Sequence, residues 1–320
     1  GYIALPPQIF WGTYYVSAVY WMGMAAGSVA ITAILQIVRG IWAAPIRRFF
    51  EANISFLPWA YVFVMCSYFG KQYLFPWGRA PMPGREWWMQ PEFVYCRMGV
   101  LLAFLFFMMT RYVKMQLRGD IGFIREQKKH AARWDGWTYD GYARNWKGAE
   151  TEVPEIQNRM SWNAPLIIAL YAIIYSLFAF EMIMSMDTVW YSNMYAGFTF
   201  VGNIYLGWVT MSIVTFFVTC SRPQVDKIVT KLQRWDLGKL SLGFCILWGY
   251  MFFAQFLPQW YGNLPEETQW MILRTREYPW KPLGWVTLAM CFIIPLMLYF
   301  SEDVKKVRNT LFGAALFTFF

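Results

Sequence analysis

The chain has 320 residues, of which 58% are hydrophobic, 21% aromatic and 15% charged, and its formal net charge is +9. Soluble domains average about 25% charged residues, so this composition excludes an ordinary soluble globular protein. The 19 Trp and 20 Tyr residues fit the aromatic belts of membrane helices at the lipid–water interfaces. We therefore expect an all-α fold, a polytopic transmembrane helix bundle that forms a single integral membrane domain over residues 1–320.

Eight apolar runs mark the expected membrane spans, because about 18 mostly apolar residues suffice for a helix to cross a bilayer. The first contains the small residues GMAAGS at 23–28, which predict close packing against another helix. The last starts near residue 310 and stops at Phe320, and the chain starts at Gly1 without a signal peptide, so we expect a longer protein trimmed at its ends. The first seven spans are expected at 14–38, 55–74, 93–112, 164–184, 195–220, 240–257 and 283–300.

The segments between the spans predict their sidedness. Most of the 28 Lys and Arg residues follow odd-numbered spans, so these loops are expected to face the cytoplasm. The longest, 113–160, is expected to be an extramembrane cytoplasmic loop. It reads either as a solvated loop with a short amphipathic helix or as a docking surface for a partner subunit. Residues 221–235 are expected to form a short interfacial amphipathic helix.

Cysteine and histidine limit the cofactors that this sequence can hold. The five Cys residues include no C-x-x-C pair, which argues against an iron–sulfur or zinc site and favours small core residues. The single histidine, His130, cannot supply both axial ligands of a bis-histidine haem. The sequence also has no nucleotide-binding loop. We expect no metal and no cofactor bound by this chain, so electrons would have to be carried by a partner.

Two acids stand at the end of the fourth span. Glu181 lies in its last turn and Asp187 just beyond, and no Lys or Arg occurs between Arg159 and Arg222. Ionisable residues at membrane depth are costly, so both are functional candidates, although Glu181 alternatively reaches the headgroup region. Glu92 and Arg97 are five residues apart, and whether they pair is left open.

The stretch 236–270 holds further polar groups around its apolar run. Asp236 and Lys239 are expected at the cytoplasmic mouth and Glu266 and Glu267 at the opposite end. A proton path needs titratable groups linked by hydroxyls and waters, whereas a quinone site needs polar partners beside an apolar slot. The alternative quinone-binding pair is Glu181 and Gln255. The proton-path candidates are Glu181, Asp187, Asp236, Lys239, Tyr250, Gln255, Glu266 and Glu267.

Several motifs carry a family resemblance. They are FEMIMSMDTVWYS at 180–192, WDLGK at 235–239 and LWGYMFFAQFLPQWYGNLPEETQW at 247–270, with YLFPW at 73–77 and MQPEFVYCRM at 89–98, and the similarity extends over nearly the whole chain. The chain resembles the NrfD and polysulfide-reductase membrane-subunit superfamily, in particular the ActF-type subunits of bacterial alternative complex III. Its Q-x-x-x-x-W-Y-x-N-x-P-E-E-T pattern begins at Gln255 and ends at Thr268. Relatives often have His where this chain has Trp235, and Asp where it has Glu181.

The resemblance implies two four-helix bundles in the bacterial inner membrane. It implies a subunit, not catalytic alone, of a respiratory quinol:cytochrome c oxidoreductase that uses menaquinol or ubiquinol. The implied partners are a second NrfD-like subunit, an iron–sulfur subunit and a multihaem cytochrome c subunit, which bring the iron–sulfur clusters and haem c. This chain is then expected to contribute a proton path beside the quinol-oxidising subunit.

Three alternatives remain open at this point. The chain itself binds the quinone, or it is only a scaffold, or it is an independent transporter. A transporter would show inverted repeats with broken helices at the membrane midplane, and the spans lack Gly/Pro breaks at matching positions.

Overall fold

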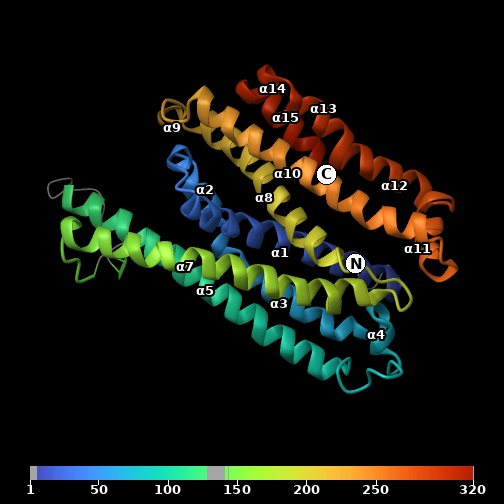
Figure 1. The fold of residues 1–320 in the computed structure, drawn as a ribbon. Coiled ribbons are helices and arrows are strands. Elements are labelled where there is room, and N and C mark those ends of the chain that lie inside the picture. The colour runs from blue at the N-terminus through green and yellow to red at the C-terminus, as the bar shows by residue number, and fades with distance from the viewer. Residues whose placement is uncertain (1–5, 128–140, 143, 320) are drawn as a thin grey trace.

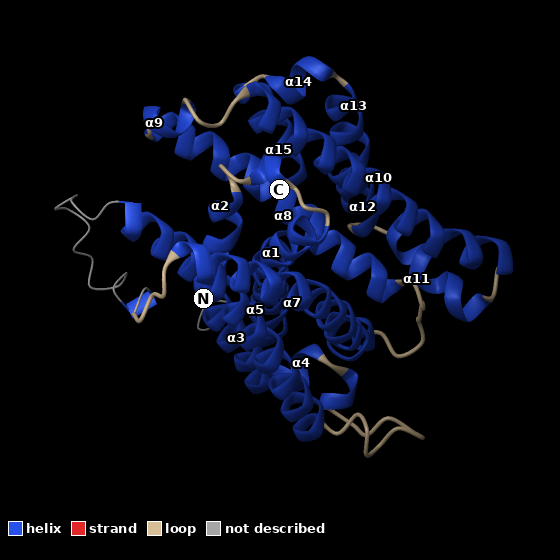
Figure 2. Cartoon of the chain, turned by 60° about the vertical axis from the view of Figure 1, so that its left-hand side comes forward, coloured by secondary structure: helices blue, strands red, loops and turns tan. Residues whose placement is uncertain are grey.

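The computed structural model describes residues 6–127, 141–142 and 144–319, and every regular element among them is helical (Figures 1 and 2). Six helices are long and apolar enough to cross a membrane, or seven if the bent pair Arg47–Ser55 and Leu57–Leu74, angled by 42°, counts as one span. This confirms the all-α, multi-pass membrane architecture. The main helices are α1 (Pro7–Ile37), α3 (Leu57–Cys66), α5 (Pro91–Gln127), α7 (Ala149–Phe178), α8 (Tyr195–Ser221), α10 (Lys231–Gly262), α12 (Trp280–Leu288) and α13 (Ile294–Phe300).

The first seven expected runs thus correspond to the six or seven helices that are long enough to cross a membrane. The eighth run, expected to start near residue 310, forms α15 (Arg308–Phe319), which has 12 residues and continues to the last described residue. Two π-helical turns lengthen other spans: Ala179–Ile183 continues α7, and Ala289–Ile293 joins α12 to α13 just before Pro295.

The connections also differ from expectation. The segment expected as a loop at 113–160 is largely helical, because α5 and α7 extend past their apolar parts to Gln127 and from Ala149; His130 lies outside the described residues. The interfacial helix expected at 221–235 is reduced to α9 (Pro223–Asp226), since Thr230 caps the N-terminus of α10 and its hydroxyl accepts from Leu232 N at 3.2 Å.

The long helices pack in two groups. In the first group, α1 packs on α3 and α7, and α5 packs on α3 and α7 (Figure 1). In the second group, α8 packs on α10 and α15, and α13 packs on both of these. The two groups meet where α1 lies against α8. Helix α1 is therefore the central element of the molecule.

Small residues make the α1–α8 contact close, as predicted from residues 23–28. A Cβ atom at Gly27 would lie 2.1 Å from the backbone oxygen of Asn203, and one at Gly23 would lie 2.2 Å from the Asn203 side-chain oxygen. On α8, a Cβ atom at Gly207 would lie 3.0 Å from the nitrogen of Ser28. In a lipid environment such direct backbone approach is a main source of helix association.

The connections gather at two ends of the helices. In Figure 1, α2 (Arg47–Ala52), α9 and α14 (Glu302–Lys306) lie toward one end, and α4 (Lys71–Leu74) and α11 (Pro265–Thr275) lie toward the other. The segments that follow odd-numbered spans thus share one end, as the Lys and Arg distribution requires. We refer to it as the basic end, and to the other as the α4–α11 end.

Candidate functional site

A buried ion pair joins α5 to the end of α7 at the α4–α11 end. The Arg97 guanidinium donates from Nη2 and Nε to Oε2 of Glu181 at 2.6 and 3.1 Å. Glu181 is only 6% exposed and lies in the π-helical turn. Such turns often occur at functional sites, and this one places the carboxylate among the helices.

Aromatic side chains enclose this pair. Trp88 Nε1 donates to the second carboxylate oxygen of Glu181 at 3.0 Å. The Arg97 guanidinium lies over the rings of Trp88 and Phe93, at 3.9 and 4.6 Å from the ring centroids. These contacts offset part of the cost of removing two charges from water.

The backbone around Glu181 is held as well. The Ser185 hydroxyl donates to the Glu181 carbonyl at 2.5 Å and accepts from Trp77 Nε1 at 2.9 Å. Arg97 Nη1, by contrast, is buried and has no hydrogen-bond partner among the described residues. The arrangement therefore offers a fixed carboxylate and one unused N–H donor group, which suits water, a proton or a polar ligand oxygen.

The structure supplies a partner for Glu181 and answers the question of Glu92 and Arg97, which the sequence left open. The cation of Glu181 comes from α5, far away in the sequence. Arg97 does not pair with Glu92; the Glu92 carboxylate instead accepts from Lys71 Nζ at 2.7 Å and from the Tyr68 hydroxyl at 3.2 Å. The signal available in the sequence was Arg97 itself, a charge inside the third apolar run at the same end as Glu181.

Asp187 has a local structural role. Its Oδ1 accepts from the backbone nitrogens of Val189 and Trp190 at 3.0 and 3.2 Å, which shapes the turn between α7 and α8. The Trp190 ring stacks on the Trp270 ring of α11, at 4.2 Å between ring centroids. The Arg274 guanidinium also lies over the Trp270 ring, 3.6 Å from its centroid. Burial lowers the pKa of Arg274, and Asp187 acts in the opposite direction.

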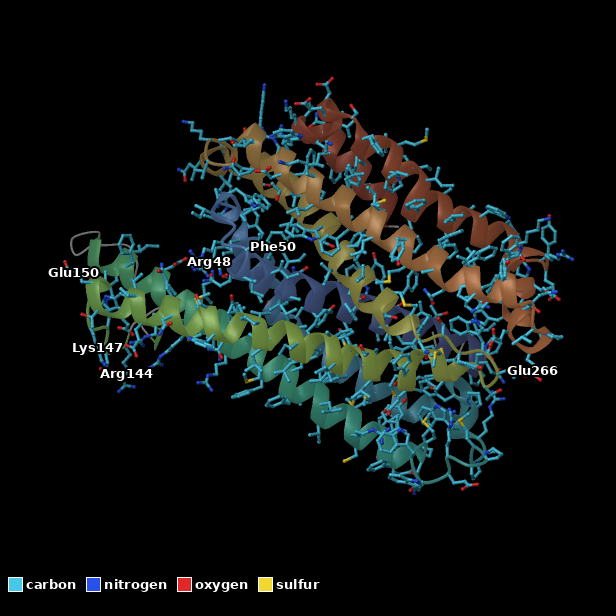
Figure 3. All side chains as sticks on the ribbon, viewed as in Figure 1. Arg48, Phe50, Arg144, Lys147, Glu150 and Glu266 are labelled. Carbon is cyan, nitrogen blue, oxygen red and sulfur yellow. The ribbon has the colours of Figure 1, made fainter. Side chains whose placement is uncertain are left out.

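Glu266 and Glu267 occupy the first turn of α11. Carboxylates there are favoured by the helix dipole, and Glu266 is exposed (Figure 3). Within the described residues, no hydrogen bond or ion pair links either of them to Glu181. The sequence predicts that Glu181, Asp187, Glu266 and Glu267 form one acid cluster on the side opposite the cytoplasm, but direct contacts among the described residues do not join Glu266 or Glu267 to Glu181.

The remaining candidates lie on α10. Asp236 pairs with Lys239 at 2.5 Å, and the Lys239 ammonium lies 4.2 Å from the Trp235 ring centroid. Tyr250 is 61% exposed, and Gln255 donates to the Met251 carbonyl of its own helix at 3.2 Å. Among the described residues, neither side chain forms a hydrogen bond to another helix.

A second buried charge cluster, missed by the sequence reasoning, lies between α2 and α5 at the basic end. Glu51 is 2% exposed and forms ion pairs with Arg47, at 3.4 Å, and with Arg48. Arg48 also pairs with Asp120, and Arg47 Nη2 donates to the Gln36 side chain of α1 at 3.1 Å. The sequence signal was Glu51 itself, an acid flanked by apolar residues.

This cluster contains several buried polar atoms without a hydrogen-bond partner among the described residues. Tyr112, Gln116 and Asp120 follow one face of α5 at four-residue spacing, so the first two face the same cluster as Asp120. Buried polar atoms of this kind are usually satisfied by internal water. The unpartnered atoms are Asn53 Nδ2, Tyr112 Oη and Gln116 Oε1, together with Arg47 Nε and Glu51 Oε1, which face each other in the ion pair at 3.4 Å without a hydrogen bond.

Metal binding finds no geometric support in the part of the chain that the structure describes, where no three His, Cys, Asp or Glu side chains are grouped as a metal site requires. Comparison of the sequence with models of known protein families and with curated proteins finds no match. What is shown is thus a multi-pass helical membrane protein with two buried charge clusters at opposite ends of its first helix group.

Proposed function

We propose that this chain is a membrane subunit of a respiratory quinol:electron acceptor oxidoreductase, not catalytic alone, and that it contributes a transmembrane proton path. The motif that runs from Gln255 to Thr268 supports membership of the NrfD-like superfamily. The division of the helices into two groups is compatible with the two four-helix bundles of that superfamily. The partners that carry iron–sulfur clusters and haem c belong to the same proposal.

The main support for a proton path is that the buried Glu181–Arg97 pair and the buried Glu51 cluster lie at opposite ends of the first helix group. Helix α1 connects these two sites. At one end the Tyr15 hydroxyl donates to the carbonyl of Met182, next to Glu181, at 2.6 Å. At the other end Gln36 accepts from Arg47. Tyr15 and Gln36 are 21 positions apart in the sequence, about 31 Å along a helix, close to the roughly 30 Å hydrocarbon core.

Polar groups occur between these ends. Ser28 and Thr32 are fully buried on α1, and the Tyr175 hydroxyl of α7 donates to the Met22 carbonyl at 3.3 Å. The hydroxyls of Ser28 and Thr32 bond to carbonyls of their own helix and retain acceptor capacity. Waters between these side chains would complete the route. The path thereby moves from α10, where the sequence suggested it, into the first helix group.

The second candidate function is quinone binding at Glu181, and one observation favours it. Arg97 Nη1 is a buried, unused donor beside the carboxylate and two aromatic rings, which is a chemistry suited to a quinone carbonyl. Gln255, the other member of the predicted quinone pair, bonds to its own helix and forms no hydrogen bond with this site among the described residues.

Glu181→Gln in the assembled complex tests the proposal. We expect slower proton-linked quinol turnover with intact assembly, because the amide cannot exchange the proton that the carboxylate carries. Glu92→Gln is the matched control, since this carboxylate lies at the same end but is exposed and pairs with Lys71. Normal turnover and normal proton release in Glu181→Gln would contradict the proposal.

Arg97→Gln separates the two candidates. If Arg97 holds a quinone headgroup, the KM for a short-chain quinol rises in this variant. If it only sets the charge of Glu181 for proton transfer, kcat falls and the KM changes little. The measurement is a steady-state titration of the assembled complex with the quinol.

A further inference from the structure

Helix α11 (Pro265–Thr275) packs on the turn between α7 and α8 through a face that carries a charge. Trp270 and Arg274 are four positions apart and therefore share this face. The Trp270 ring stacks on Trp190 of the turn, and the Arg274 guanidinium lies over the Trp270 ring. None of the eleven residues of α11, which the structure describes in full, is buried. The stack is therefore a contact of one face of a helix that is otherwise open.

The apolar side chains of α11 lie on the other side. Ile272 is two positions from both Trp270 and Arg274, which places it about 160° away around the helix. Ile272, its neighbour Leu273, and Leu264 just before the helix are all exposed. An amphipathic helix in water turns its apolar residues toward the protein and its charges outward. In α11 the arginine faces the protein and the isoleucine faces outward, as on a surface that contacts lipid.

The ends of this connection lie at the boundary of the membrane. The apolar run of α10 ends at Leu257, and Trp260 follows it by about 4.5 Å along the helix axis. On the other side, Trp280 precedes the apolar run that starts at Leu283 by about 4.5 Å. The headgroup layer occupies about 5–8 Å on each side of the hydrocarbon core. The chain therefore leaves and re-enters the membrane through this layer, on either side of α11.

The contact with α12 keeps the last turn of α11 at the same depth. A Cβ atom at Gly284 would lie 3.1 Å from the carbonyl oxygen of Arg274, so this turn lies beside α12 (Figure 1). Gly284 is the second residue of the seventh expected apolar run. Ile272 and Leu273 come directly before Arg274, and they are thus close to the level at which the hydrocarbon core starts. Glu266 belongs to the first turn, at the other end of α11.

Aromatic residues frame α11 along the chain. Trp260 and Tyr261 precede it, Tyr278 and Trp280 follow it, and all four are exposed. Trp and Tyr are enriched at the level of the lipid headgroups, because their rings are apolar and carry a polar group. The outer face of α11 thus lies between two pairs of residues that are typical of the membrane interface.

From this geometry we infer that α11 is an interfacial helix, whose outer face of Leu264, Ile272 and Leu273 binds the lipid layer at the α4–α11 end. Helices of this kind bury their apolar face about 5–10 Å into the boundary between headgroups and acyl chains. The stack of Trp190 on Trp270 links this lipid contact to the turn that follows Glu181. The inference does not depend on the proposed role in quinol oxidation.

Nitroxide labels measure the depth of this face directly. The full chain carries Cys96→Ser and Cys220→Ser, which remove the two exposed thiols, and is placed in nanodiscs of dioleoyl phosphatidylcholine. With a label at Ile272→Cys, power-saturation electron paramagnetic resonance compares collisions with oxygen, which is enriched among acyl chains, and with a water-soluble nickel chelate. We expect this label to lie about 5–10 Å inside the boundary. A label at Leu273→Cys repeats the measurement at the neighbouring position.

Glu266→Cys is the matched control, because this residue of the same helix is exposed and lies in its first turn. Its label should collide mainly with the nickel chelate. Ile246→Cys, an exposed position near the middle of the apolar run of α10, marks the interior of the acyl chains. Equal access of the nickel chelate to the labels at Ile272 and Glu266 would overturn the inference, because α11 would then lie in water. A label at Ile272 that neither reagent reaches would also overturn it, in favour of a protein contact.

Discussion

The two helix groups differ in what they bury. In α1, 78% of the membrane-length window is buried, whereas the corresponding shares are 17% in α10 and 11% in the span Trp280–Phe300. The first group encloses Glu51 and Glu181 with their arginine partners. The second group exposes large apolar residues such as Phe253 and Trp285. The buried ion pairs with glutamate thus lie in the first group, whereas the second group presents apolar surface to lipid or to a neighbouring subunit.

The largest expected effect comes from breaking the buried pair of the first group. Arg97→Leu leaves the Glu181 carboxylate buried without its cation, which costs about 3–5 kcal/mol. Lys71→Leu removes the cation of Glu92, an exposed carboxylate, and should cost about 0–1 kcal/mol. The measurement is reversible unfolding in mixed micelles with increasing dodecyl sulfate. Equal losses in the two variants would show that Glu181 is hydrated in the native state.

A smaller effect is expected at the contact between the two groups. Gly27→Ala places a methyl group against the backbone of Asn203, which cannot rotate away, so we expect a loss of about 1–3 kcal/mol. Gly12→Ala is the control on the same helix, because nothing lies within 4 Å of a Cβ atom at that position. The same unfolding titration reads both variants. An unchanged stability in Gly27→Ala would mean that α1 and α8 are further apart than the structure has them.

The smallest effect distinguishes tyrosines of the two groups. Tyr15→Phe removes the hydrogen bond to the Met182 carbonyl and should cost about 0.6 kcal/mol, the average for such bonds in membrane proteins. Tyr250→Phe should be neutral, since this residue of α10 is 61% exposed. Thermal unfolding of the two variants in one detergent gives the comparison. A larger loss in Tyr250→Phe would indicate a buried partner for its hydroxyl.

Most of the fold could be predicted from the sequence, because apolar runs long enough to cross a bilayer are a strong signal. The small residues around Gly27 likewise predicted a close helix contact, and the structure supplies α8 as the partner. Helix ends were predicted poorly: α5 continues past the point where hydropathy falls, since a polar sequence can remain helical outside the membrane.

The site was harder to predict, because its charges meet only after folding. The sequence identifies Glu181 as an acid at membrane depth. Its partner Arg97 belongs to another helix, so the spacing of residues along the sequence does not predict the pair. The Glu51 cluster was missed, since α2 and α5 are brought together by packing alone. The polar residues at the two ends of the sixth apolar run formed a local pattern that favoured a proton path there, although only 17% of the membrane-length window of α10 is buried.

Two variants at the basic end distinguish a proton path in the first helix group from one in the second. Glu51→Gln and Asp236→Asn each remove a titratable group at the basic end, in the first and second group respectively. In the assembled complex, reconstituted in liposomes, we expect Glu51→Gln to slow proton-linked quinol turnover and Asp236→Asn to leave it unchanged. The reverse result, with Asp236→Asn impaired and Glu51→Gln normal, would contradict a path along α1.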